Sequence, residues 1–219
     1  MDLKIQVETI QNKILNYQKA GYRLCISSSF QTHSLSLLHI VTQAIPDLPV
    51  LFIDTGYHFP ETYAFRNQIT QEWQLNLINV QSKTPKNQQV DTNGQFLYAT
   101  DPEYCCVINK VEPLNEALLQ YDVWIAGLRR DQTKFREDLQ EEVFQENGIL
   151  KYHPILNWNS KMIYEYAKQN NLPRHPLEDK GYFSIGCMPC TTSVSEDMER
   201  SGRWFGSKKT ECGIHLTKS

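Results

Sequence analysis

Four of the six cysteines are grouped in two close pairs, a pattern that is typical of metal binding. Cys105 and Cys106 are adjacent, and Cys187 and Cys190 form a Cys-x-x-Cys motif 81 residues further on (187 − 106). Four thiolates are the usual ligands of a 4Fe–4S cluster, and they also suit tetrahedral zinc. Adjacent ligands favour the bulkier cluster, because their sulfurs can bind different irons. Zinc and four buried free thiols remain as alternatives.

The remaining two cysteines have different surroundings. Cys212 lies in a polar segment with Lys208, Lys209 and His215 nearby, where a thiol pKa can be lowered and the thiolate can act as a nucleophile. An incidental surface cysteine is the alternative reading of Cys212. Cys25 lies in an apolar run and is predicted to be a small core residue.

Basic residues and serines occur where they could bind an anion. Arginine suits the oxygens of phosphate and sulfate, and a serine turn before a helix offers hydroxyl and amide hydrogens. Lys110 follows Cys106 by four residues, so on an α-helix the two would share a face and the ammonium could offset cluster charge. The alternatives are a solvated charged face for Arg200 and Arg203, an exposed helix lysine for Lys110, and an ordinary helix cap for the serines. The candidates for anion binding are Ser27, Ser28, Ser29, Lys110, Arg129, Arg130, Arg200 and Arg203.

These residues must be positioned by elements that alternate between helix and strand. Such alternation predicts an α/β fold with a mostly parallel sheet that is covered on both faces. Residues 81–103 read as a long loop or lid, and residues 191–219 as a flexible tail after a domain over residues 1–190. The expected elements are helices at 3–20, 32–44 and from Pro60, and strands at 23–26, 50–53, 75–80 and 123–126.

Parallel sheets bind ligands beyond the carboxyl ends of their strands. That rule selects Ser27–Phe30 after the first strand, Asp54-Thr55-Gly56 after the second, and Gly127–Gln132 after the fourth. The three segments contain most of the candidate anion-binding residues. We therefore expect a site for an anionic small molecule at this edge of the sheet.

The composition excludes several classes of protein. Hydrophobic residues make up 40% of the 219 residues, charged residues 21%, and the formal net charge is −3, so no overall basic field recruits nucleic acid. The apolar runs are far shorter than a membrane span, and from the polar start of the chain we expect no signal peptide. We expect a cytoplasmic protein without membrane or nucleic-acid partners, which leaves a homo-oligomer open.

Six segments together resemble the assimilatory adenylyl-sulfate and phosphoadenylyl-sulfate reductases, over about Gly21 to Leu216. The most specific segment is the last, because the nucleophilic cysteine of the family lies there. The segments are Ser27–Phe30, Asp54–Tyr63, Lys110–Leu114, Gly127–Gln132, Gly181–Cys187 and Lys209–His215.

The resemblance implies a Rossmann-like fold similar to the adenine-nucleotide alpha-hydrolases. It implies that Cys212 attacks the sulfur of adenylyl sulfate or phosphoadenylyl sulfate, which leaves an S-sulfocysteine. A thioredoxin or glutaredoxin-type reductant then releases sulfite. The paired cysteines match the branch of the family that carries a 4Fe–4S cluster, and Lys110 matches the lysine between cluster and substrate.

Two positions depart from the pattern of that branch. Its first turn usually reads Ser-Phe-Ser-Gly, whereas Ser27-Ser28-Ser29-Phe30 is similar to the cluster-free branch that uses phosphoadenylyl sulfate. Thr192 stands where the family often has arginine. The sequence therefore leaves the choice between the two nucleotide sulfates open.

Two other functions compete with this interpretation. A tRNA-thiolation enzyme on a similar fold would carry a Ser-Gly-Gly-x-Asp-Ser loop for the pyrophosphate of ATP, and residues 27–33 lack it. A non-enzymatic iron–sulfur or zinc protein that senses redox state would need neither Cys212 nor nucleotide binding.

Overall fold

The computed structural model describes residues 2–193, 202 and 213–215 of the chain. The chain forms two compact units, and each is built from three separate segments. The first unit comprises Met1–Phe52, Arg66–Ile78 and Leu118–Arg174, and the second comprises Ile53–Phe65, Asn79–Ala117 and His175–Ser219. The predicted boundary at residue 190 stays a prediction, because most of residues 191–219 lie outside the described part.

A six-stranded sheet in the order β3-β2-β1-β4-β6-β5 organises the fold. Strand β1 pairs in parallel with β2 and β4, β4 pairs in parallel with β6, and only the edge pair β5–β6 is antiparallel among these pairings. The predicted mostly parallel α/β architecture is confirmed. The strands are β1 (Leu24–Ser27), β2 (Val50–Ile53), β3 (Leu77–Val80), β4 (Val123–Ala126), β5 (Glu142–Phe144) and β6 (Leu150–Tyr152).

The central strands are the ones that the sequence makes visible. All four residues of β4 are buried, and so are the first three of β1, because strands covered on both faces need continuous apolar runs. Cys25 in β1 is fully buried, as predicted, and its burial raises the pKa of its thiol. The third strand, β3, begins at Leu77, two residues after the predicted start at residue 75.

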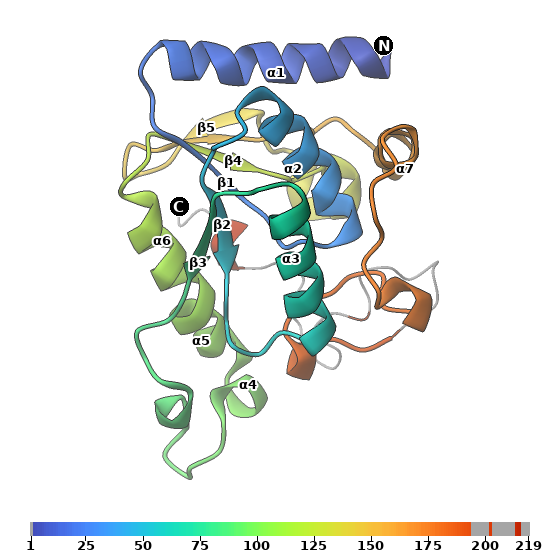
Figure 1. The fold of residues 1–219 in the computed structure, drawn as a ribbon. Helices are drawn as coiled ribbons and strands as arrows, with labels where there is room; N and C mark the ends of the chain where they lie inside the picture. The colour runs from blue at the N-terminus through green and yellow to red at the C-terminus, as the bar shows by residue number, and fades with distance from the viewer. Residues whose placement is uncertain (1, 194–201, 203–212, 216–219) are drawn as a thin grey trace. The chain divides into compact units, whose positions relative to one another are not determined.

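Helices of the first unit pack on one another. Helix α1 (Leu3–Lys19) contacts α2 (Thr32–Ala44), and α2 contacts α7 (Ser160–Gln169) (Figure 1). Asn159 caps α7 by accepting a hydrogen bond from the amide of Met162. Strands β5 and β6 and helix α7 were not predicted.

The second unit consists mainly of short helices around two small apolar clusters. One cluster joins Phe59, Leu177 and Ile185, and the other joins Leu97, Cys105 and Ile108. The predicted loop over 81–103 is only partly irregular, because it contains a 3₁₀ turn and a short helix. The elements are α4 (Leu97–Thr100), α5 (Pro102–Cys106), the π-helix η2 (Val107–Val111), α6 (Glu112–Leu118), and 3₁₀ turns at Lys86–Gln88, Glu178–Lys180, Met188–Cys190 and Gly213–His215.

Helix α3 (Pro60–Glu72) begins in the second unit and ends in the first. Pro60 occupies its first position, where no backbone hydrogen bond is lost, and Glu61 lies in the first turn. No helix in the described part of the chain is long and apolar enough to cross a membrane.

Candidate active site

The turn after β2 is held by the carboxylate of Asp54. Its Oδ1 accepts hydrogen bonds from the amide of Gly56 at 2.9 Å and the hydroxyl of Tyr63 at 2.6 Å, and its Oδ2 accepts from Gln81 at 2.9 Å. Partial burial opposes ionisation, but these hydrogen bonds outweigh it and lower the pKa of Asp54. Gly56 has φ +70°, a left-handed conformation that suits glycine. Asp54 therefore shapes this turn through its own hydrogen bonds.

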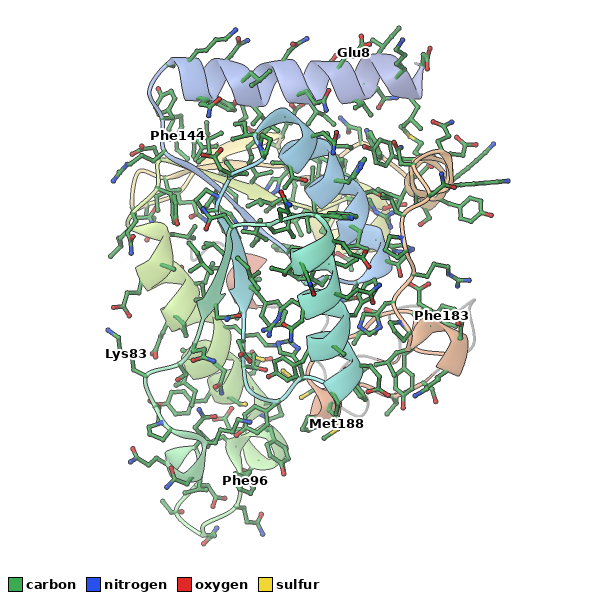
Figure 2. All side chains as sticks on the ribbon, viewed as in Figure 1. Glu8, Lys83, Phe96, Phe144, Phe183 and Met188 are labelled. Atoms are coloured by element: carbon green, nitrogen blue, oxygen red, sulfur yellow. The ribbon has the colours of Figure 1, made fainter. Side chains whose placement is uncertain are left out.

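The same turn lies against the Cys-x-x-Cys motif. His58 and Cys187 form an antiparallel bridge, and the amide of Met188 donates to the carbonyl of Tyr57 at 2.7 Å. Thr55 Oγ1 lies 3.2 Å from Cys187 Sγ and also accepts from the amide of Tyr57, so its hydrogen is available to the sulfur. Met188, which Figure 2 labels, leaves half of its surface exposed. The structure thus brings the turn at 54–56 to one cysteine pair.

The adjacent cysteines end a short helix whose start is well capped. Asp101 accepts from the amide of Tyr104 at 2.9 Å, and Pro102 occupies the first turn. Directly after Cys106 the helix widens into η2, and π-helical turns often occur at functional sites. The condition that Cys106 and Lys110 lie on one α-helix is therefore not met, because Lys110 belongs to the π-helix.

Lys110 lies within the π-helix and is only 8% exposed. The alternative of an ordinary exposed helix lysine is therefore wrong. A buried ammonium is costly unless negative charge or hydrogen-bond acceptors surround it. Its burial in the unit that contains both cysteine pairs suits the predicted role in offsetting negative charge.

All four cysteines are electrostatic neighbours in the second unit. Burial, followed by the other three sulfurs, raises the pKa of the Cys105 thiol to about 11. Cys105, Cys106 and Cys187 are buried, and Cys190 is partly exposed. Negative charge on such a group of thiolates requires a compensating cation.

Within the described residues, no three or more His, Cys, Asp or Glu side chains are arranged to hold a single metal ion. A tetrahedral zinc ion would require sulfurs at about 2.3 Å from one point. A cluster is larger than one ion, and its ligands can bind different irons. Thiolates are donors that suit an iron–sulfur cluster and also zinc, and the other three sulfurs are electrostatic neighbours of Cys105.

The short turn Gly213–His215 lies against the π-helix. A β-carbon on Gly213 would lie 3.1 Å from Val111 Cγ2, so the backbone of Gly213 packs closely against Val111. The turn Gly213–His215 contacts η2 more widely. Cys212, Arg200 and Arg203 lie outside the described residues, as do most residues of the predicted flexible tail. His215 is described only in its backbone.

The first unit contains the serine turn after β1. Ser27 Oγ accepts from the indole of Trp124 at 2.8 Å, and Ser28 Oγ accepts from the amide of Phe30 at 3.2 Å. Ser29 donates to Ser34 within α2 at 3.3 Å. Phe30 adopts φ +55°, which is strained for a bulky residue, and it is fully buried. The serines thus form a compact turn that leads into α2.

Arg129 and Arg130 make internal contacts in the first unit. Arg129 is 2% exposed, with Nε 3.2 Å from Asp131 Oδ1 and Nη2 donating to Ser160 Oγ at 3.2 Å. Arg130 donates to the carbonyl of Leu139 at 2.7 Å. Asp131 also accepts from the amide of Ser160, the first residue of α7. These arginines therefore anchor the loop after β4 through their internal contacts.

Three further basic residues of the first unit were missed in the sequence. Arg136, Lys151 and His153 are all buried, and Lys151 Nζ lies 4.3 Å from the centre of the Trp124 ring. Burial, followed by the charges of Lys151 and Arg136, lowers the pKa of His153 to about 4. Lys151 lies in a three-residue strand, which is too short to show a pattern. These buried basic side chains join Arg130 as candidates for anion binding.

Comparison with known proteins identifies relatives along most of the chain. Residues 23–193 match the model of the phosphoadenosine phosphosulfate reductase domain. An adenosine 5'-phosphosulfate reductase of Lysinibacillus sphaericus is 37% identical over 206 residues, which cover 91% of this chain and 87% of that protein. A phosphoadenosine 5'-phosphosulfate reductase of Gloeobacter violaceus is 39% identical over 200 residues, covering 89% and 83% respectively.

Solved structures show the same fold. A phosphoadenylyl-sulfate reductase from Candida auris, in complex with phosphate, aligns with a TM-score of 0.67 and 23% identity over 88% of this chain and 96% of its own. An FMN adenylyltransferase from Candida glabrata aligns with a TM-score of 0.63 and 16% identity over 85% of this chain and 62% of its own. At these identities the likeness extends to the fold alone.

Proposed function

The chain belongs to the phosphoadenosine phosphosulfate reductase domain family, and from that premise we propose that it reduces a nucleotide sulfate to sulfite in sulfate assimilation. The substrate is adenylyl sulfate or phosphoadenylyl sulfate. Relatives of similar identity carry each of the two activities in their names, so family membership does not decide between them.

The proposed nucleophile is Cys212. Its thiolate attacks the sulfur of the substrate's sulfate group, the bond from that sulfur to the phosphate oxygen breaks, and the nucleotide leaves with the bonding electrons. An S-sulfocysteine remains. A thiol of a thioredoxin or glutaredoxin-type protein then attacks Cys212 Sγ and releases sulfite, and its second thiol frees Cys212 as the reductant becomes a disulfide. The sulfate sulfur gains two electrons, which the two thiols supply.

One observation carries this proposal most directly. Gly213, the residue after Cys212, packs on Val111, the residue after the buried Lys110. A nucleophile one residue from this contact would act next to a buried positive charge. That charge would stabilise both the thiolate and the negative charge that develops in the transition state.

We further propose that Cys105, Cys106, Cys187 and Cys190 bind a 4Fe–4S cluster. The proximity of the four sulfurs and the hydrogen-bond donors beside them support this assignment. When bound, the cluster would contribute its charge to the electrostatics of the site without carrying the electrons of the reaction. Lys110 would then offset negative charge within the same unit.

The substrate is an anion, and we propose that buried basic groups bind its phosphate and sulfate oxygens. Arg129, Arg136 and Lys151, which are buried in the first unit, are the basic groups proposed for this role. Arg200, Arg203 and His215 remain proposed contacts from the tail. The other proposed substrate-binding residues are Ser27, Ser28, Ser29, Asp54, Thr55, Gly56, Lys110 and Arg130.

Mass spectrometry of the intact, anaerobically purified protein tests the mechanism. The protein is mixed with each nucleotide sulfate in the absence of any protein reductant, and we expect one added SO₃ group that maps to Cys212. Cys212→Ser should form no adduct, and the substrate that reacts faster with the wild type identifies the preference. A protein with an intact cluster that forms no adduct with either substrate would contradict the mechanism and favour a redox-sensing protein.

A further inference from the structure

Two uncharged amide side chains are buried beside the tandem cysteines. Gln89 follows the 3₁₀ turn Lys86–Gln88, and Asn109 lies in the π-helix four residues after Cys105. Each is only 2% exposed. A buried amide is costly unless its hydrogen bonds are made, so the partners of this pair decide what it does.

The two amides bond to each other in both directions. Gln89 Nε2 donates to Asn109 Oδ1 at 3.0 Å, and Asn109 Nδ2 donates to Gln89 Oε1 at 2.8 Å. The second hydrogen of Gln89 Nε2 goes to the carbonyl of Thr84 at 2.8 Å, and its Oε1 also accepts from the hydroxyl of Tyr57 at 3.2 Å. Every hydrogen-bonding position of Gln89 is therefore in use.

The second hydrogen of Asn109 points at Cys105. Asn109 Nδ2 lies 2.9 Å from the carbonyl oxygen of Cys105 and 3.6 Å from its sulfur. Rotating the Asn109 amide by half a turn would set its oxygen against both of these acceptors and against Gln89 Oε1. The pairing with Gln89 thus permits only one orientation of Asn109, the one that directs a donor at Cys105.

We propose that Gln89 is a positioning residue for Cys105 and acts on it through Asn109. Gln89 lies 16 residues before Cys105 (105 − 89) and outside its helix, so it links the connection between β3 and α4 to a cysteine of the proposed cluster site. The part of the inference that concerns the cluster depends on the proposed function. The positioning of the Cys105 side chain does not.

Loss of the Gln89–Asn109 pair should weaken binding of the proposed cluster. Residues that hydrogen-bond to a metal ligand without binding the metal typically change metal affinity by 10- to 100-fold when they are removed. Hydrogen bonds to ligand sulfurs also help to set the reduction potential, because they stabilise the more negative state. Removing the Asn109 donor should therefore lower the potential and speed cluster loss.

The first test measures iron release from the anaerobically purified holoprotein under a chelator. We expect Asn109→Leu and Gln89→Met each to accelerate release by about tenfold. The double variant should be no faster than Asn109→Leu alone, since Gln89 acts through Asn109. Gln88→Met, the same change at the exposed neighbouring position, is the matched control and should behave as wild type.

The second test uses cluster-free protein, so it tests the positioning role of Gln89 separately from the proposed cluster. Alkylation of each cysteine is followed by mass spectrometry, since a buried thiol reacts only when its surroundings open. Cys105 should react several-fold faster in both single variants, with no further gain in the double variant, while Cys25 stays unchanged.

Three results would overturn the positioning role. They are an unchanged Cys105 rate, an equal rise at Cys25, and an effect of Gln89→Met that persists in the Asn109→Leu background. A wild type that binds no iron would refute the proposed cofactor, and the alkylation rates would still decide the positioning role.

Discussion

Acidification should destabilise the protein through His153, whose surroundings resist a positive charge. Its imidazole is 1% exposed, and its pKa falls from 6.5 to about 4 because of burial and the neighbouring Lys151 and Arg136. The folded state therefore takes up a proton only near pH 4, whereas the unfolded chain does so near pH 6.5. The stability from neutral His153 is complete above pH 6.5 and is lost progressively toward pH 4.

The two pKa values set the size of the effect. The full difference corresponds to about 3 kcal/mol of unfolding free energy, and about 2 kcal/mol of it should be lost between pH 8 and pH 5. Urea unfolding at these two pH values, followed by circular dichroism, measures the loss.

The matched variant is His153→Gln, which cannot titrate and can still donate to the carbonyl of Ala126, the partner of His153 Nδ1. Its stability should fall by about 2 kcal/mol less than that of the wild type over the same interval. His175 also has a pKa lowered to about 4, but it is present in both proteins, so its contribution cancels. Equal losses in wild type and variant would refute the reasoning.

Three further predictions concern the second unit. Lys110→Ala should lower turnover by on the order of a hundredfold while the thermal unfolding midpoint changes little, and full turnover would contradict its electrostatic role. Thr55→Val keeps the side-chain shape but removes the contact with Cys187 Sγ, worth about 1 kcal/mol, so iron release under a chelator should be faster than in wild type. Gly213→Val would press on Val111 and should slow adduct formation on Cys212 about tenfold, with an unchanged rate as the contrary result.

The sequence predicts the central sheet well, because burial on both faces demands continuous apolar runs. The run Val123–Ala126 is fully buried, as such a pattern requires. The edge strand Glu142–Phe144 escapes detection because it is short, largely exposed and mixed in character. Its neighbour at Leu150–Tyr152 includes a buried lysine, which no apolar pattern reveals.

The candidate site is predictable in its cysteines and much less so in its supporting residues. Residue type and spacing single out the tandem pair and the Cys-x-x-Cys motif. Burial of Lys110 depends on the π-helix, and Asn109 in that helix pairs with Gln89, 20 residues earlier in the chain. The spacing of residues along the chain predicts neither the burial of Lys110 nor the pairing of Gln89 with Asn109, so only the tertiary structure identifies them.

The interleaving of the two units has a consequence for synthesis on the ribosome. The chain passes between the units five times, and the first unit is complete once Arg174 has been made. Domains generally fold as units during elongation, so the first unit can fold before Cys187 and Cys190 leave the exit tunnel. The second unit must wait for them, which would make loading of the proposed cluster a late event in the maturation of the nascent chain.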